Sequence, residues 1–146
     1  PAALSIACQV ELTSDESISN SSETSVPFDA ATWEVGGTGI WDIGTPERLT
    51  PGVAGVYRVF AAVTFAADVD GYRRAAVRMN GTTSYIIGQH PCVSDAAKTT
   101  AFSGFRDLVF TATDYVELRV FHNAGAALNL LSGANETVFG LRGLPV

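Results

Sequence analysis

Apolar and polar residues alternate over most of this chain, with the period of two that is typical of β-strands. In the clearest stretch, residues 4–13, one face carries Leu4, Ile6, Cys8, Val10 and Leu12. The same pattern predicts strands at 57–65, 72–79, 83–87 and 115–121, and short apolar segments predict others at 26–28, 33–35, 100–103, 108–110, 126–131 and 137–141. Only residues 124–131 could compete as a helix, and Gly125 weakens that alternative. We therefore expect an all-β protein of about ten strands.

Turn residues separate the predicted strands. Asn80-Gly81 is the strongest hairpin signal, and Pro51-Gly52 precedes the segment at 57–65. The polar stretch Ser14–Ser25 and the looser stretch Gly88–Thr99 are predicted to be loops. Because no repeat or linker divides the chain, residues 1–146 are expected to form a single sandwich or jelly-roll domain.

The predicted strand at 57–65 is apolar on both sides of its alternation, so we expect it to be buried on both faces. One side, which carries Tyr57, Val59 and Val63, can enter the core of the domain. Phe60 lies on the opposite side, where a single copy offers no core. Burying an aromatic side chain is worth roughly 1.5–3 kcal/mol, which favours association with further copies. The alternative is that Phe60 packs under a loop.

The composition of the chain limits the kinds of partner that we expect. The chain is 47% hydrophobic and 16% charged, with a net charge of −6. It has no apolar run near the roughly 20 residues of a membrane span, so we expect no membrane insertion. The acidic balance and the lack of a Lys/Arg run argue against nucleic-acid binding. We also expect no signal peptide, since the first strand begins almost at residue 1.

No catalytic or cofactor motif is recognisable, so we predict no enzyme and no cofactor. The sequence has no Gly-x-Ser-x-Gly, no His-Glu-x-x-His and no phosphate-binding glycine loop. His90 and Cys92 have no third or fourth ligand at a recognisable spacing, and we predict no metal site there. Asp68, Asp70 and Gly71 faintly resemble a calcium loop, but a solvated turn is expected.

The two cysteines are expected to be unrelated. Cys8 lies on the apolar side of the first predicted strand, and Cys92 follows His90-Pro91 in a predicted loop. Two positions alone do not establish a pairing, so we expect one buried thiol and one separate free thiol.

Several motifs occur in the order found in one superfamily. Residues 48–57, Arg-Leu-Thr-Pro-Gly-Val-Ala-Gly-Val-Tyr, resemble the F-T-A-P-V-A-G-x-Y core of C1q/TNF-like domains. Asn80-Gly81 matches the hairpin of that superfamily. The remaining matches are Phe28, Trp33 and Trp41-Asp42 as upstream aromatic positions, Thr113-Asp114-Tyr115-Val116 as a turn, and Phe139-Gly140-Leu141 as the closing strand. Val59 and Thr113 depart from the pattern, and residues 71–83 look more like the C1q-like modules of bacteriophages and bacteria.

This resemblance implies a ten-stranded jelly roll that assembles as a compact homotrimer. In such a trimer the side of the central strand opposite Tyr57 packs near the threefold axis. By position, Phe60 corresponds to an axial aromatic residue, and Phe102 and Val138 fall on the two neighbouring axial strands. These three residues are the trimer interface that the resemblance predicts.

Two functional hypotheses follow. The first is a structural protein on a bacteriophage virion, most simply a capsid decoration protein, because no shaft, heptad or collagen repeat is present and threefold symmetry can match a capsid lattice. Its partners would be other virion proteins. The second is a recognition module, either the receptor-binding head of a tail fibre or a secreted C1q-like protein. In that case the segments 14–25, 88–99 and 124–133 would bind a host receptor.

Overall fold

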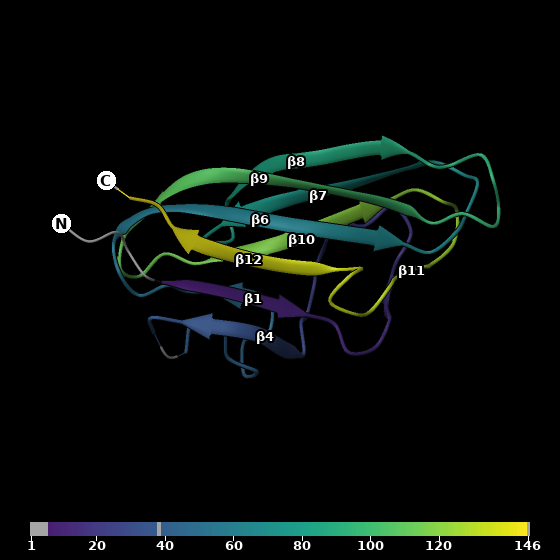
Figure 1. Ribbon diagram of the computed structural model, residues 1–146. Helices are drawn as coiled ribbons and strands as arrows, with labels where there is room; N and C mark the ends of the chain where they lie inside the picture. The colour runs from purple at the N-terminus through teal and green to yellow at the C-terminus, as the bar shows by residue number, and fades with distance from the viewer. Residues whose placement is uncertain (1–5, 38, 146) are drawn as a thin grey trace.

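The computed structural model describes residues 6–37 and 39–145, and within them all regular structure is β. Two antiparallel sheets pack face to face (Figure 1). Sheet A contains β1 (Ala7–Glu11), β2 (Glu16–Ile18), β4 (Ala30–Val35), β6 (Gly55–Phe65), β9 (Thr100–Phe110), β11 (Leu128–Leu130) and β12 (Val138–Gly143). Sheet B contains β3 (Thr24–Ser25), β5 (Arg48–Leu49), β7 (Tyr72–Met79), β8 (Thr83–Pro91) and β10 (Val116–His122). The all-β jelly-roll prediction is confirmed.

Strand β6 is the centre of sheet A. It pairs with β12 on one side and, along its whole length, with β9 on the other. Strands β1 and β4 continue the sheet beyond β12 (Figure 1). In sheet B, β7 lies between β10 and β8, and the short strands β3 and β5 both pair with β10.

The core lies between the sheets, where the alternation predicted it. Cys8, Val10 and Leu12 are buried, whereas Leu4 lies outside the described residues. Phe28 stacks on Phe139 with ring centroids 5.9 Å apart. The wall opposite β6 is built by alternate residues of β7 and β10, which are Ala75, Val77, Val116, Leu118 and Val120.

Several predicted boundaries were wrong. The segments at 100–103 and 108–110 form one continuous strand, β9, because residues 104–107 pair with β6 although their own alternation is weak. The strand predicted at 83–87 runs on to Pro91, and the predicted loop at 14–25 contains β2 and β3. In each case pairing with a neighbouring strand outweighs the local residue preference.

A single chain buries only the inward face of β6, and burial of the outward face by another copy stays a prediction. Its inward residues, from Tyr57 to Phe65, are buried. On the outward side Val56, Arg58, Phe60 and Ala62 are only half-buried in a single chain.

Asn80-Gly81 forms the predicted hairpin. Both residues have positive φ, 52° and 68°, as a turn of the type I′ class requires. The Asn80 side chain then ties this hairpin to the turn before β10, since its Nδ2 donates to Asp114 Oδ1 at 2.9 Å and its Oδ1 accepts from Tyr115 N at 3.0 Å. Two of the motifs that carried the family resemblance are therefore in direct contact.

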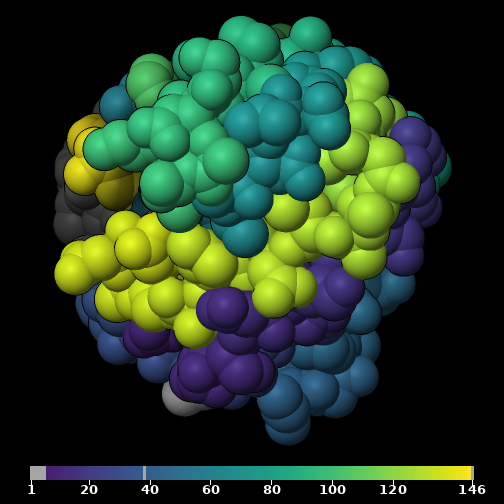
Figure 2. Space-filling view, turned by 90° about the vertical axis from the view of Figure 1, so that its right-hand side faces the viewer, coloured from purple at the N-terminus to yellow at the C-terminus, as the bar shows by residue number. Residues whose placement is uncertain are grey.

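The two ends of the sandwich differ. Strand β1 begins and strand β12 ends at the same end (Figure 1). The segments 12–23, 66–71, 92–99 and 123–137 gather at the other end, which Figure 2 shows face on as adjoining purple, teal, green and yellow-green surfaces. The three segments proposed to carry specificity all contribute to this end.

Candidate interaction surface

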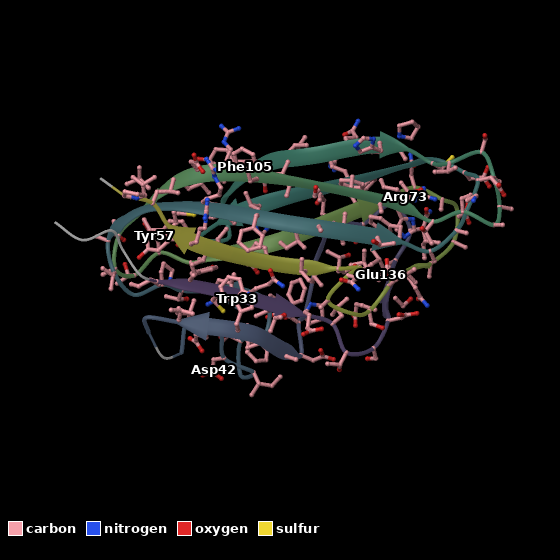
Figure 3. All side chains as sticks on the ribbon, viewed as in Figure 1. Trp33, Asp42, Tyr57, Arg73, Phe105 and Glu136 are labelled. Atoms are coloured by element: carbon pink, nitrogen blue, oxygen red, sulfur yellow. The ribbon has the colours of Figure 1, made fainter. Side chains whose placement is uncertain are left out.

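The outward side of sheet A, called here the outer face of sheet A, carries a cluster of apolar side chains. In an antiparallel sheet, residues directly opposite each other point to the same face. Phe60 on β6 is opposite Phe105 on β9 and Gly140 on β12, and Ala62 is opposite Val138. Phe105 is 57% exposed, and Figure 3 labels it near the upper edge of the sheet. Phe60, Phe105 and Val138 therefore share one surface.

This surface is hollowed. An open groove of about 560 Å³ runs over β6 and its neighbours, and it is lined by Gln9, Arg58, Phe60, Ala61, Ala62, Ser103, Gly104, Phe105 and Val138. Most of these side chains present carbon atoms to the groove. A concave apolar surface of this kind suits another protein surface better than it suits water.

The tip of the Phe60 ring lies over Gly140 of β12. A side-chain carbon at Gly140 would clash with the Phe60 ring and would lie 2.6 Å from the carbonyl oxygen of Cys8. Glycine at this position lets the ring pack onto the backbone of the neighbouring strand. Phe60 is therefore not covered by a loop, which was the alternative, and its other side faces the groove.

Charged residues border the apolar cluster toward the end of the sandwich where β1 begins and β12 ends. Arg58 donates from Nε and Nη2 to the two oxygens of Asp107, at 2.8 and 2.9 Å, and its guanidinium lies 4.2 Å from the centre of the Phe105 ring. The hydrogen bond from Arg58 lowers the pKa of Asp107, and the charge of Arg142, opposite Arg58 on β12, acts in the same direction. This pair fixes the orientation of Phe105.

Phe102 does not lie on this surface, which corrects its predicted place beside Phe60 and Val138. It is opposite Val63 in the β6–β9 register and so faces the inside of the sandwich. There it packs against the core and against the His90 ring, 5.0 Å away, in the space left by Gly88. Phe105 occupies the outward position instead. Its outward position is not evident from the sequence, because it lies in a stretch whose alternation is too weak to predict a strand.

The suggested calcium turn is organised by an arginine. Arg73 is completely buried, and its Nη atoms donate to the carbonyl oxygens of Asp70 at 2.7 Å and Asp68 at 3.2 Å (Figure 3). These carbonyls are the kind of oxygen that would coordinate calcium. The guanidinium thus occupies the place of a cation. The alternation of Arg73 with Ala75 and Val77 was the available signal that this arginine faces the core.

The remaining candidate side chains do not come together in one site. Cys8 is a buried free thiol whose pKa burial raises to about 12, and Cys92 is a half-buried free thiol that donates to Val69 O at 2.7 Å. Within residues 6–37 and 39–145, no three His, Cys, Asp or Glu side chains come together as metal ligands. The same ranges contain no helix that is long and apolar enough to cross a membrane.

Comparisons with known proteins support the fold. No family model matches the chain, and no curated protein does. Among solved structures, the globular domain of zebrafish complement 1qA protein aligns over 94% of this chain and 95% of its own, with a TM-score of 0.62 and 16% identity. This protein has a C1q/TNF-like jelly-roll fold.

Two further structures extend the likeness. Murine APRIL at pH 5.0 aligns over 96% of this chain and 99% of its own, with a TM-score of 0.69 and 13% identity. The Eiger TNF structure from S. frugiperda covers 96% of this chain and 93% of its own, with a TM-score of 0.61 and 13% identity. At these identities the likeness concerns the C1q/TNF-like fold.

Proposed function

We propose that this protein is a non-enzymatic homotrimer in which other copies of the chain cover the outer face of sheet A. The observation that carries the proposal is the groove beside Phe60, together with the exposure of Phe105. An apolar hollow is costly to leave in water, and a second protein surface can fill it. The resemblance of the sequence to C1q/TNF-like domains implies that the assembly has three copies.

The two edges of sheet A support a closed ring of copies. On the β9 edge Phe105 and Val109 are 57% and 74% exposed. On the opposite edge, β4 presents Trp33 and Val35, which are 39% and 52% exposed and share the outward face with Gln9 and Ala7. A cyclic trimer uses a heterologous contact, in which one edge of each copy meets a different edge of the next. Two unlike apolar edges meet that requirement.

Within this proposal the preferred role is structural, as a decoration protein at the surface of a bacteriophage capsid. A threefold molecule can sit on a threefold point of a capsid lattice and contact several subunits at once. The similarity of residues 71–83 to phage and bacterial C1q-like modules supports the virion setting.

The second candidate is a recognition module, either a tail-fibre head or a secreted C1q-like protein. The observation that favours it is the gathering of 12–23, 92–99 and 123–137 at one end of the sandwich (Figure 2). Loops on a rigid sandwich are where binding residues concentrate. In a trimer this end would present three copies of the same loops.

The molecular mass of the protein in solution tests the proposed trimer. Light scattering of the purified protein should give three times the mass of one chain. Phe60→Asp and Phe105→Asp each place a charge on the outer face of sheet A, so each should yield folded monomer or dimer. A wild-type monomer, or a trimer that is unchanged by both substitutions, would refute the proposed interface.

Phe102→Asp is the matched control. Its side chain is directed toward the core, so the aspartate should lower the thermal stability of the fold instead of changing only the assembly state. Circular dichroism melting separates the two effects.

The position of the protein on phage particles tests which of the two roles it has. Electron microscopy of phage particles that carry the protein should show many copies distributed over the capsid if it is a decoration protein. A few copies at the tail tip would favour the receptor-binding candidate, and absence from particles would reject both virion roles.

A further inference from the structure

Positive charge is concentrated in sheet B of an otherwise acidic protein. The residue ranges of β3, β5, β7, β8 and β10 contain five arginines and one carboxylate, Glu117, a formal charge of +4 in a chain of −6. Arg73 points inward. The other four lie on the outward side, called here the outer face of sheet B, and are Arg48, Arg74, Arg78 and Arg119.

The four arginines form an ordered array. Arg119 is opposite Ala76, and Arg74 and Arg78 are two residues away along β7 in either direction. At the rise of a β-strand, Arg74 and Arg78 are therefore about 13 Å apart. Arg74 stacks over Phe121 at 4.7 Å, and Arg48 stacks over Tyr115 at 4.0 Å. Stacking holds these guanidinium groups in fixed orientations before any partner arrives.

Two of these arginines are already paired with carboxylates of the same chain. Glu23, just before β3, pairs through its carboxylate with Arg74 and accepts from Arg119 through its backbone carbonyl at 3.2 Å. Glu117 pairs with Arg78 at 3.2 Å. These contacts leave Arg48 and Arg119 without a carboxylate partner among the described residues.

An exposed apolar residue lies beside the array, on the edge strand β8. Ile86 on β8 is opposite Ala76 and is 57% exposed, so it stands in the same row as Arg119. Arginines that surround an exposed aliphatic residue resemble the composition of protein–protein interfaces more than that of an ordinary surface.

We propose that the outer face of sheet B binds a short acidic segment of a partner protein in extended conformation. Alternate residues of an extended segment point the same way. A segment with acidic, apolar and acidic residues at positions i, i+2 and i+4 would place carboxylates over Arg74 and Arg78, in competition with Glu23 and Glu117. Its apolar side chain would lie beside Ala76 and Ile86, in the row of the unpaired Arg119.

A long polyanion fits less well. The residues outside the strands carry ten carboxylates and Lys98 as their only cation, so the loops have a formal charge of −9. A nucleic acid or a sulfated polysaccharide would run past these loops and be repelled, whereas a short segment would end before reaching them. The face is on the opposite sheet from the proposed trimer interface, so the inference does not depend on the number of copies.

The test uses the full chain and a synthetic peptide with Glu-Thr-Leu-Thr-Glu at its centre. Nuclear magnetic resonance titration of ¹⁵N-labelled protein should show shifts confined to β5, β7, β8 and β10, and affinity should fall with added salt. Arg119→Glu should weaken binding about tenfold or more, which corresponds to a loss of about 1.4 kcal/mol. Arg48→Glu, on the exposed short strand β5, serves as a second variant if Arg119→Glu does not fold.

Lys98→Glu is the matched control, because it makes the same change in net charge within a loop. It should change affinity less than twofold. A peptide of the same composition with its two glutamates adjacent should bind at least tenfold more weakly than the alternating one.

Three results would overturn the proposal. They are no binding of the alternating peptide at millimolar concentration, equal effects of Arg119→Glu and Lys98→Glu, and preference for dextran sulfate over the peptide at the same face. The last result would identify a general polyanion surface.

Discussion

The most consequential single residue in the core is Arg73. Its side chain is fully buried and donates hydrogen bonds to backbone carbonyls of the 68–72 turn. The guanidinium carbon lies 5.9 Å from the centre of the Phe65 ring. A buried charge needs hydrogen bonds to offset the loss of water, and the two Nη atoms of Arg73 make them, whereas its buried Nε has no partner within the described part of the chain. The hydrogen bonds from Arg73 hold the backbone of this turn in its conformation.

Arg73→Met should therefore destabilise the protein by about 3 kcal/mol, because the carbonyls of Asp68 and Asp70 lose the hydrogen bonds that they accept from the buried guanidinium. Urea unfolding followed by circular dichroism measures the change. Arg106→Met, on an exposed strand position, should change stability by no more than about 0.5 kcal/mol. Calcium should not raise the melting temperature of the wild type, since the guanidinium already occupies the carbonyl oxygens.

Asp114 makes the stability of the fold depend on pH. Hydrogen bonds from the backbone of Thr111 and from the side chain of Asn80 lower its pKa from the ordinary value of 3.8. A lowered pKa in the folded state means that the stabilising contribution is fully present above the unfolded pKa and is lost as pH falls through the folded value.

We expect wild type to be more stable than Asp114→Asn at pH 7, with a difference that stays constant down to about pH 5 and shrinks below pH 4. Urea unfolding at a series of pH values measures this difference. Asp107→Asn provides a comparison, since Arg58 lowers the pKa of Asp107 in the same way. A difference that persists unchanged at pH 2 would contradict this account.

At the scale of elements, the contact between β6 and β12 depends on the absence of a side chain. The Phe60 ring occupies the space that a Cβ at Gly140 would need, and the carbonyl of Cys8 on β1 closes the other side. Three neighbouring strands thus constrain one position.

Gly140→Ala should cost about 1–3 kcal/mol through overpacking. Adding Phe60→Ala should recover part of that loss, because it removes the ring but not the Cys8 carbonyl. A double-mutant cycle on the free energy of unfolding measures the coupling. Strict additivity would show that the ring does not pack onto Gly140 in solution.

At the scale of the whole molecule, the two sheets have different outward faces. Sheet A presents the apolar groove and sheet B presents the arginine array. The sandwich can therefore use one face for its own copies and keep the other for a partner, with the acidic loops between them.

This separation predicts independent defects. Arg119→Glu should leave the mass of the assembly unchanged, and Phe105→Asp should leave the affinity for the acidic peptide within about twofold of wild type. Light scattering and the peptide titration, each applied to both variants, check this. A variant that loses both properties would show that the faces are coupled.

The sequence by itself determined the class of fold and most of the strands. Period-two alternation needs no tertiary information, and neither does the demand for positive φ that Asn80-Gly81 satisfies, because both are properties of the local backbone. The outward side of Phe60 follows from Tyr57 and Val59, which take the inward side of β6, whereas the place of Val138 on β12 follows from the family resemblance.

Only the tertiary structure decided which aromatic residue of β9 faces outward. Phe102 and Phe105 are an odd number of residues apart, so they point to opposite faces, and the weak pattern of 100–107 does not say which face is which. Pairing of Phe102 with Val63 settles it. The outer face of sheet B likewise arises from cross-strand register, since its arginines come from segments as distant as β5 and β10, and alternation within one strand carries no information about its neighbour.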